Sequence, residues 1–209
     1  MKIDAITQYL DELFKEPKSE LNFKNNYELL VAVILSAQCM DQRVNLITPK
    51  LFAIYPSVYD LAKANQIEVE NIIKPCGFYH NKAKSIISAS NVIVKDFNGQ
   101  VPDKFDDLIT LKGVGRKTAN VVLAVAFKQN RIGVDTHIFR VSHRLKLSNG
   151  TTADSVETDL IKLLNNSNLA KMHYQLLLFG RYVCKARNPL CKDCKIKSYC
   201  EYYKSKNKF

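Results

Sequence analysis

The most reactive pattern in the sequence is a lysine that follows a glycine-rich turn. Residues 111–122 read LKGVGRKTANVV, so Arg116 and Lys117 stand where a run of helix-forming residues begins. The amino end of a helix is the positive pole of its dipole and disfavours cations. The two basic residues are explained if they face an external phosphate, which the free amides at a helix start also bind. The same positive field lowers the pKa of a lysine, and a neutral lysine amine is a nucleophile.

An aspartate marks the start of a later helix. Residues 134–141 read VDTHIFRV, and Asp135 is the predicted N-cap of a helix over 136–145. An ionised carboxylate there could stabilise positive charge that develops on a substrate. Lys117 and Asp135 also have structural interpretations. Most lysines simply lie on the surface, and most aspartates at the start of a helix only cap that helix. Spacing alone favours the structural interpretation.

Four cysteines form the third reactive group. They have the spacing C-x6-C-x2-C-x5-C and are Cys184, Cys191, Cys194 and Cys200. The N-terminus lacks the basic start and apolar run of a signal peptide, so disulfides are not expected. Four thiolates can hold a zinc ion or an iron–sulfur cluster, and their number leaves both open. The two remaining cysteines, Cys39 and Cys76, are each expected to be a small buried hydrophobe.

The elements that position these residues are predicted to be helical nearly throughout. Apolar residues recur at helical spacing, and strand-like alternation is absent beyond a few residues. Pro49 should kink or shorten the helix that contains it. The sequence therefore predicts an all-α protein of about ten helices, over 3–14, 27–38, 41–51, 57–64, 67–73, 81–97, 103–111, 118–127, 136–145, 153–164 and 171–184.

The charge of the chain favours an anionic partner. The 31 basic and 20 acidic residues give a net charge of +11, and nucleic acid is the commonest partner of such a protein. Residues 184–209 contribute eight basic and two acidic residues, a net of +6. This segment is either a solvated basic tail or a binding surface. No apolar run is long enough to cross a membrane, so a cytoplasmic, monomeric protein with no membrane association is expected.

The glycine turn resembles a helix-hairpin-helix motif, a DNA-binding module that grips backbone phosphates. The pattern L-x-x-L-x-G-V-G-x-x-T-A spans 108–119, within a hairpin of about 104–127, and its predicted apolar anchors are Leu108, Leu111, Val114, Ala119 and Val122. Together with VDTHIFRV, the whole chain resembles the endonuclease III family of DNA glycosylases. LSAQ at 35–38, ELNF at 20–23, NKA at 81–83, GRYVC at 180–184 and the four terminal cysteines carry the same resemblance.

The resemblance implies an activity and a cofactor. It implies that Lys117 attacks C1′ of a damaged nucleoside, expels the base and forms a Schiff base that permits β-elimination. Asp135 would assist as a base or as a stabiliser of the sugar cation. The four cysteines would hold a [4Fe-4S] cluster. The substrate would be an oxidised pyrimidine in double-stranded DNA, removed in base excision repair.

The resemblance also implies DNA contacts. Gln38 and Phe78 would fill the void left by an extruded base, although Phe78, often leucine in relatives, could equally be a core residue. The hairpin would grip phosphates through Gly113, Gly115 and Arg116. The basic residues of the cysteine loop, Lys185, Arg187 and Lys192, would contact the DNA backbone. Structural roles are expected for His137 and His143.

The chain departs from the family pattern at a few positions. Cys39-Met40 replaces the small residues common after LSAQ, and Lys112 stands where a proline is common. Neither change touches the implied chemistry.

The expected organisation has two lobes. A helical lobe over 21–131 carries the hairpin, and residues 1–20 with 132–209 form the second lobe with the iron–sulfur loop at 184–200. DNA is expected to cross the groove between them, where Lys117 and Asp135 meet.

Two other functions remain open. An adenine-mismatch glycosylase shares the fold and the cluster, but its relatives typically lack the lysine and carry a further C-terminal domain. A non-catalytic DNA-binding module is disfavoured by the presence of both Lys117 and Asp135.

Overall fold

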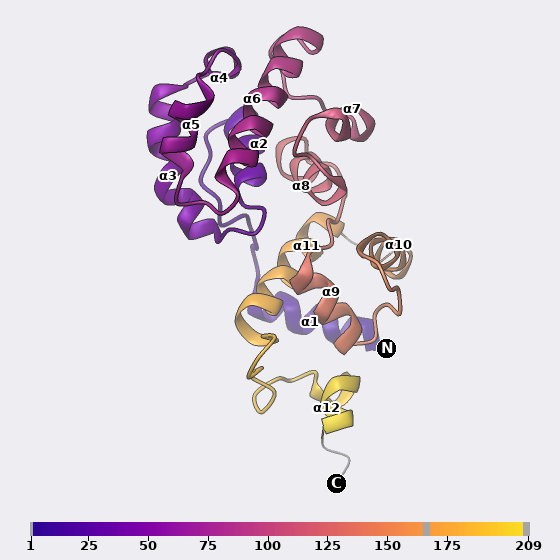
Figure 1. Ribbon diagram of the computed structural model, residues 1–209. Helices are drawn as coiled ribbons and strands as arrows, with labels where there is room; N and C mark the ends of the chain where they lie inside the picture. Colours follow the sequence, from indigo (N-terminus) through magenta and orange to yellow (C-terminus); the bar gives the residue numbers. More distant parts are fainter. Residues whose placement is uncertain (1, 165–167, 207–209) are drawn as a thin grey trace. The chain divides into compact units, whose positions relative to one another are not determined.

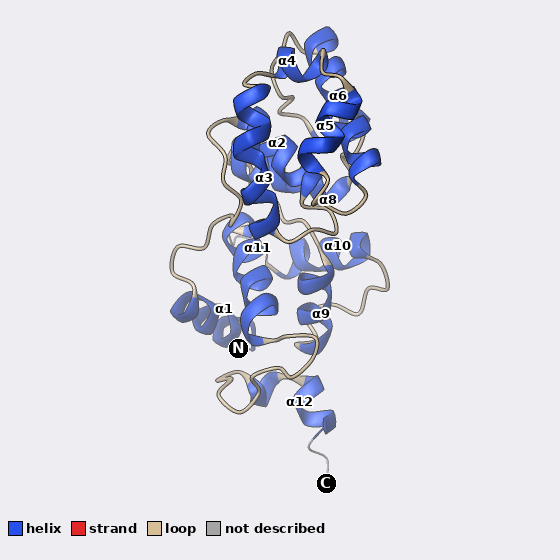
Figure 2. Cartoon of the chain, turned by 60° about the vertical axis from the view of Figure 1, so that its left-hand side comes forward, coloured by secondary structure: helices blue, strands red, loops and turns tan. Residues whose placement is uncertain are grey.

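Helices make up all the regular structure in the described part of the chain. The computed structural model describes residues 2–164 and 168–206, and these ranges contain no β-strand (Figures 1 and 2). They hold twelve α-helices, one π-helical turn and one 3-10 turn, against about ten helices predicted. The predicted all-α class is confirmed. In the same ranges, no helix combines the length and apolar character needed to span a bilayer.

The chain divides into two compact units. One unit is Ser19–Gln129, and the other joins Met1–Lys18 to Asn130–Phe209. The Ser19–Gln129 unit contains α2 (Asn26–Leu35), α3 (Asp41–Ile54), α4 (Val58–Ala62), α5 (Gln66–Ile73), α6 (Tyr79–Asp96), α7 (Phe105–Thr110) and α8 (Arg116–Ala126).

The core of the Ser19–Gln129 unit is built around α2. Every residue from Tyr27 to Leu35 is buried, which agrees with a helix that is apolar on all sides. The side chain of Asn25 caps this helix by accepting a hydrogen bond from the Glu28 amide at 2.9 Å. Helices α3, α6 and α8 pack against α2, so the segment that holds the hairpin rests on a rigid support.

Pro49 does not shorten its helix. α3 continues past the proline to Ile54, beyond the predicted end at Leu51, so the expected shortening is not found. Val44, Ile47 and Leu51 are buried on one face of this helix and bracket the proline. Tertiary packing of this face outweighs the local penalty of the proline.

The second unit is organised around α9 and α11. Its elements are α1 (Lys2–Leu13), α9 (Thr136–Arg144), α10 (Ala153–Leu163), α11 (Leu169–Leu178), the π-helical turn Phe179–Val183, the 3-10 turn Lys197–Tyr199 and α12 (Glu201–Lys206). Ile6 and Leu10 of α1 are fully buried, and Tyr9 meets the ring of Phe179 edge-on. The N-terminal helix is thus packed into the same unit as the C-terminal helices.

Two C-terminal features were not predicted. The helix expected over 171–184 starts at Leu169 and changes to π-helical geometry at Phe179. α12 was missed altogether, because none of its residues is buried and its sequence therefore carries no apolar periodicity.

Candidate active site and metal centre

The predicted helical hairpin is formed by α7 and α8, which lie against each other (Figure 1). Its five predicted apolar anchors are all buried: Leu108, Leu111, Val114, Ala119 and Val122. α8 begins at Arg116, two residues earlier than predicted. Arg116 and Lys117 are therefore the first and second residues of the helix, where backbone amides have no partner within the helix.

The fold requires a glycine at one of the two glycine positions of the hairpin but not at the other. Gly113 has a φ of +84°, and a Cβ there would lie 2.8 Å from the Cβ of Ser85, so the fold itself requires glycine. Gly115 has an ordinary φ of −93°, and a Cβ there would meet no atom within 4 Å. The fold does not need a glycine at 115, and the space over the start of α8 is open.

The first turn of α8 is electrostatically unusual. It contains no acidic residue, and Gly115 offers no side chain to cap the free amides. Arg116 is exposed, with its guanidinium carbon 5.4 Å from the centre of the Phe105 ring. Lys117 is half-buried. This turn combines a helix start that no side chain caps, the positive helix pole and two cations, which suits it to bind an anion.

Asp135 is the N-cap of α9, as predicted. Its Oδ1 accepts hydrogen bonds from the amides of His137 at 2.9 Å and Ile138 at 2.8 Å. Both bonds use the same oxygen, and within residues 2–164 and 168–206 no hydrogen bond is made to Oδ2. The half-buried carboxylate is therefore fixed through one oxygen while the other remains available to a substrate.

The histidines of α9 differ in their surroundings. Both ring nitrogens of His143 face carbonyl oxygens, Nδ1 that of Phe139 at 2.8 Å and Nε2 that of Gly150 at 2.9 Å. This geometry gives His143 a structural role. His137 lies 3.3 Å from the guanidinium of Arg140.

Gln38 and Phe78 lie on two neighbouring turns. Gln38 follows α2 with a φ of +53°, and Phe78 precedes α6 with a φ of +58°. A Cβ on Gly77 would lie 3.9 Å from the carbonyl oxygen of Gln38, so the turns are close. The side chain of Phe78 is 65% exposed, which excludes the core interpretation of this residue. Left-handed geometry at both residues costs free energy and is typical of functional turns.

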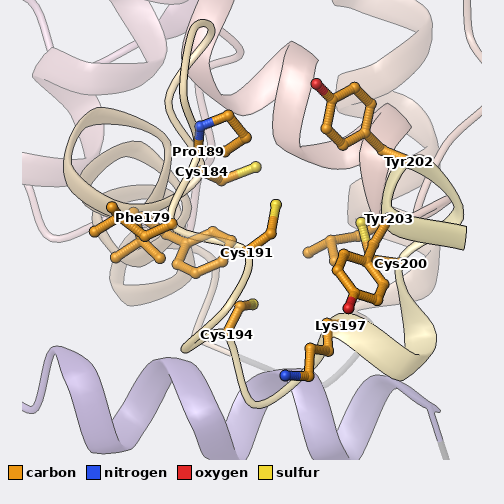
Figure 3. A pocket seen from close by; sticks show the side chains of 12 residues that line it. Phe179, Cys184, Pro189, Cys191, Cys194, Lys197, Cys200, Tyr202 and Tyr203 are labelled. Carbon is orange, nitrogen blue, oxygen red and sulfur yellow. The ribbon is translucent and has the colours of Figure 1, made fainter. Parts of the chain in front are cut away.

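The four C-terminal cysteines line one pocket. Their side chains project into a common space between the π-helical turn and α12 (Figure 3). The pocket has an empty volume of about 350 Å³, partly open to solvent, and Phe179, Tyr202 and Tyr203 also line it. Within the described ranges, no three side chains of the types His, Cys, Asp or Glu converge closely enough to hold a metal ion as they are placed.

Burial and crowding perturb two of these thiols. Burial raises the pKa of the Cys194 thiol, and the neighbouring Cys184, Cys200 and Cys191 raise it further. Burial likewise raises the pKa of Cys200. Four thiols in one pocket repel each other as thiolates, and a bound cationic centre relieves that repulsion.

Two arginines that the sequence analysis missed tie α9 to the cysteine loop. Arg140 donates to the carbonyls of Gly180 at 2.7 Å and Cys184 at 3.1 Å. Arg144 donates to the carbonyl of Lys185 at 2.7 Å and to the Cys184 sulfur at 3.4 Å. Their spacing of four residues places them on one helix face, which is the only signal that the sequence offered.

The basic residues of the loop fall into two groups. Lys195 is paired with Glu12 at 2.7 Å, and Lys197 donates to the Lys192 carbonyl at 2.7 Å, so both hold the loop in place. The other basic side chains are exposed and make no ion pair or hydrogen bond within the part of the chain that the structure describes: Lys185, Arg187 and Lys192. These three are the ones available for phosphates.

The class of protein is defined by a family comparison. Residues 31–166, which include the hairpin and Asp135, match the family described as HhH-GPD superfamily base excision DNA repair protein. The chain belongs to this superfamily.

Similar proteins and structures indicate the family within this superfamily. The chain is 45% identical to endonuclease III of Rickettsia felis, over 97% of this chain and 95% of that protein. It is 41% identical to endonuclease III of Escherichia coli K12, over 96% and 95% of the two chains. Its fold matches a trapped endonuclease III–DNA covalent intermediate with a TM-score of 0.94 and 38% identity, covering 99% of this chain and 98% of that one. Within the superfamily, this is a chain of the endonuclease III family, a base excision repair glycosylase and AP lyase.

Proposed function

We propose that this chain removes oxidised pyrimidines from damaged double-stranded DNA and then cleaves the abasic strand by β-elimination. The observation that carries the proposal is the start of α8. Open space over Gly115, uncapped amides and Arg116 provide for a phosphate, and the amine of Lys117 follows in the same turn. The similarity to an endonuclease III trapped covalently on DNA supports a covalent mechanism.

Lys117 is the proposed nucleophile. Its neutral amine attacks C1′, the glycosidic bond breaks, and the base leaves with the bonding electrons and a proton. Opening of the sugar ring gives a Schiff base between C1′ and the lysine nitrogen. Loss of a C2′ proton then expels the 3′ phosphate. The positive pole of α8 and Arg116 favour the neutral amine that this sequence of steps needs.

Asp135 is proposed to stabilise the cation that develops on the sugar. Two backbone amides hold Oδ1, and Oδ2 is the oxygen that faces the charge or accepts a proton.

The proposed DNA contacts are of two kinds, contacts to backbone phosphates and insertion into the base stack. Gly113, Gly115 and Arg116 grip a phosphate and position the duplex without reading sequence. Gln38 and Phe78 enter the stack where the damaged base has left it, since both are exposed on turns that lie side by side. Lys185, Arg187 and Lys192 contact further phosphates.

A [4Fe-4S] cluster is proposed for the cysteine pocket. Cys184, Cys191, Cys194 and Cys200 supply the four thiolates that such a cluster requires. The similarity of the whole chain to endonuclease III proteins supports a cluster rather than a single zinc ion. When bound, the cluster would cross-link the loop through the four cysteine thiolates. Purified protein should carry iron and inorganic sulfide; one zinc ion per chain would contradict the assignment.

The setting proposed for this activity is the bacterial cytoplasm, with the chain acting as a monomer on nucleoid DNA. The similar endonuclease III chains of Rickettsia felis and Escherichia coli support that setting.

One assay separates the proposed function from the nearest alternative. Duplexes that contain thymine glycol, an abasic site or an A·G mismatch are incubated with the protein, with and without borohydride. We expect nicking of the first two and a covalent adduct when borohydride is present. Release of adenine from the mismatch without any trapped adduct would instead indicate an adenine-mismatch glycosylase.

A further inference from the structure

Two cysteines outside the proposed active site lie against each other. The sulfurs of Cys39 and Cys76 are 3.5 Å apart, although the residues are 37 positions apart in sequence. Both thiols are free. Cys76 is 0% exposed, whereas Cys39 is half-buried and can be reached from solvent. The sequence expectation of two separate buried hydrophobes is therefore wrong for Cys39 and incomplete for Cys76.

The two thiols join the turns that carry the proposed void-filling residues. Cys39 directly follows Gln38 in the turn between α2 and α3, and Cys76 lies two residues before Phe78 in the turn between α5 and α6. Gln38 and Phe78 both have left-handed backbone geometry. A covalent link at these cysteines acts directly on the backbone that presents both side chains.

A buried lysine lies near the thiol pair. Lys82 is 6% exposed, and its Nζ has no hydrogen-bond partner among the described residues. Burial raises the pKa of Cys76 to about 12, and the positive charges of Lys82 and Arg43 oppose that rise. Burial also lowers the pKa of Lys82, so this amine holds its proton less tightly than an exposed lysine does.

We propose that Cys39 and Cys76 form a reversible disulfide that ties the two turns together and slows the release of damaged bases. The effect on base release rests on the proposed function, whereas the formation of the disulfide does not.

The oxidant is a low-molecular-weight disulfide. The thiolate of Cys39, the more accessible group, attacks one sulfur of the oxidant and expels one small thiolate. The sulfur of Cys76 then attacks the Cys39 sulfur of the mixed disulfide and expels the second. In total, two cysteine thiols are oxidised, one disulfide is reduced to two small thiols, and an added thiol reverses the exchange.

The link changes the position of both turns. A disulfide has an S–S length of about 2.05 Å, so the sulfurs must approach by about 1.5 Å. Gln38 and Phe78 are adjacent to the atoms that move. A displacement of about 1 Å in a positioned group can cost about a hundred-fold in rate, so a loss of about ten-fold or more is expected.

The test uses the full chain with its cluster intact. Reduced protein is equilibrated with mixtures of reduced and oxidised glutathione, and cluster absorbance is followed throughout. Free thiols are alkylated, and the cross-linked peptide that contains Cys39 and Cys76 is sought by mass spectrometry. Base release from a thymine glycol duplex is measured before oxidation, after oxidation and after addition of dithiothreitol. Cys39→Ser and Cys76→Ala are carried in parallel.

The expected result is a 39–76 cross-link in the wild-type chain and a reversible loss of base release that both variants lack. Complete alkylation of both thiols after oxidation would overturn the proposal. So would an equal loss of activity in Cys39→Ser, or an unchanged rate in cross-linked protein. If the reduced wild-type chain releases no base, the proposed function is wrong. The mass of the cross-linked peptide still shows whether the disulfide between Cys39 and Cys76 forms.

Discussion

At the scale of single residues, the proposed chemistry depends on the amine of Lys117 and the carboxylate of Asp135. Both stand at the start of a helix: Lys117 is the second residue of α8, and Asp135 caps the first amides of α9 through Oδ1. The positive pole of α8 disfavours a cation at Lys117, which suits the proposed attack by a neutral amine. The carboxylate of Asp135 is proposed to meet the positive charge that develops on the sugar.

Asp135→Asn separates catalysis from capping. Asparagine caps helices about as well as aspartate, so the variant should unfold at the same temperature as the wild type. Its base release should fall about a hundred-fold or more, because the negative charge is removed. Asp135→Ala is the matched control and should also lose about 1 kcal/mol of stability. Single-turnover kinetics and thermal unfolding measure the two effects, and near-wild-type turnover in Asp135→Asn would exclude the electrostatic role.

The sequence predicted roles that depend on local structure better than contacts between segments that are far apart in the chain. The cap geometry of Asp135 was predicted because capping is local in sequence. The closeness of Cys39 to Cys76 and the bonds from Arg144 to the cysteine loop were not, because they join segments far apart in the chain. The exposure of Phe78 likewise depends on how two turns meet.

At the scale of elements, some residues of the hairpin are needed for folding and others are available for the proposed recognition of DNA. The buried anchors and Gly113 are required by packing, and Gly115 is not. The sequence shows two equivalent glycines, and the structure distinguishes them by their φ angles and by what surrounds their missing Cβ atoms.

Gly113→Ser and Gly115→Ser should therefore fail in different ways. Serine at 113 meets Ser85 and a positive φ, so we expect a loss of about 1–3 kcal/mol in the free energy of unfolding. Serine at 115 is a favourable N-cap and should leave stability unchanged. It occupies the space proposed for a phosphate, so DNA affinity should fall about ten-fold, the size expected when a hydrogen bond to a charged group is removed. Thermal unfolding measures the stability and fluorescence anisotropy the DNA affinity. A loss of stability with unchanged DNA affinity in Gly115→Ser would show that Gly115 serves only the fold.

The cysteine loop is a second element whose order depends on a neighbouring helix. Arg144 donates to the carbonyls of Lys185 and Ala186, and its guanidinium lies 4.0 Å from the centre of the Tyr202 ring. These contacts fix the loop between α9 and α12.

Arg144→Gln should loosen this loop. Amide hydrogen exchange in residues 185–191 should become at least about ten-fold faster, since hydrogen bonds to charged groups contribute about 1.5–3 kcal/mol each. Lys146→Gln is the control, because it removes an exposed charge from just beyond the same helix without touching the loop. Unchanged exchange in Arg144→Gln would show that the bonds from Arg144 do not hold the loop in place.

At the scale of the whole molecule, charge and fold point to the same partner. The net charge of +11 suits a polyanion, and the chain is a member of a family of base excision DNA repair proteins. The helical class could be predicted from apolar periodicity in nearly every segment. The exception was α12, whose sequence carries no periodic signal, whereas the π-helical turn lies inside the helix predicted over 171–184 and differs only in its geometry.

Salt dependence tests the electrostatic surface. Replacing Lys185, Arg187 and Lys192 together by alanine should lower the slope of log affinity against log salt by up to about 2.7, or about 0.9 for each phosphate that is no longer neutralised. Lys95→Ala, at the far end of α6 from Phe78, should leave the slope unchanged. An unchanged slope in the triple variant would make the loop a solvated tail rather than a DNA-binding surface.

Borohydride trapping tests the central claim most directly, because it records the bond that Lys117 is proposed to form. The wild-type chain is incubated with an abasic duplex and borohydride, and the adduct is mapped by peptide mass spectrometry. We predict that the adduct lies on Lys117 and that Lys117→Gln, with its fold and DNA binding intact, gives none. An adduct on another amine, or trapping by Lys117→Gln at the wild-type rate, would contradict the assignment.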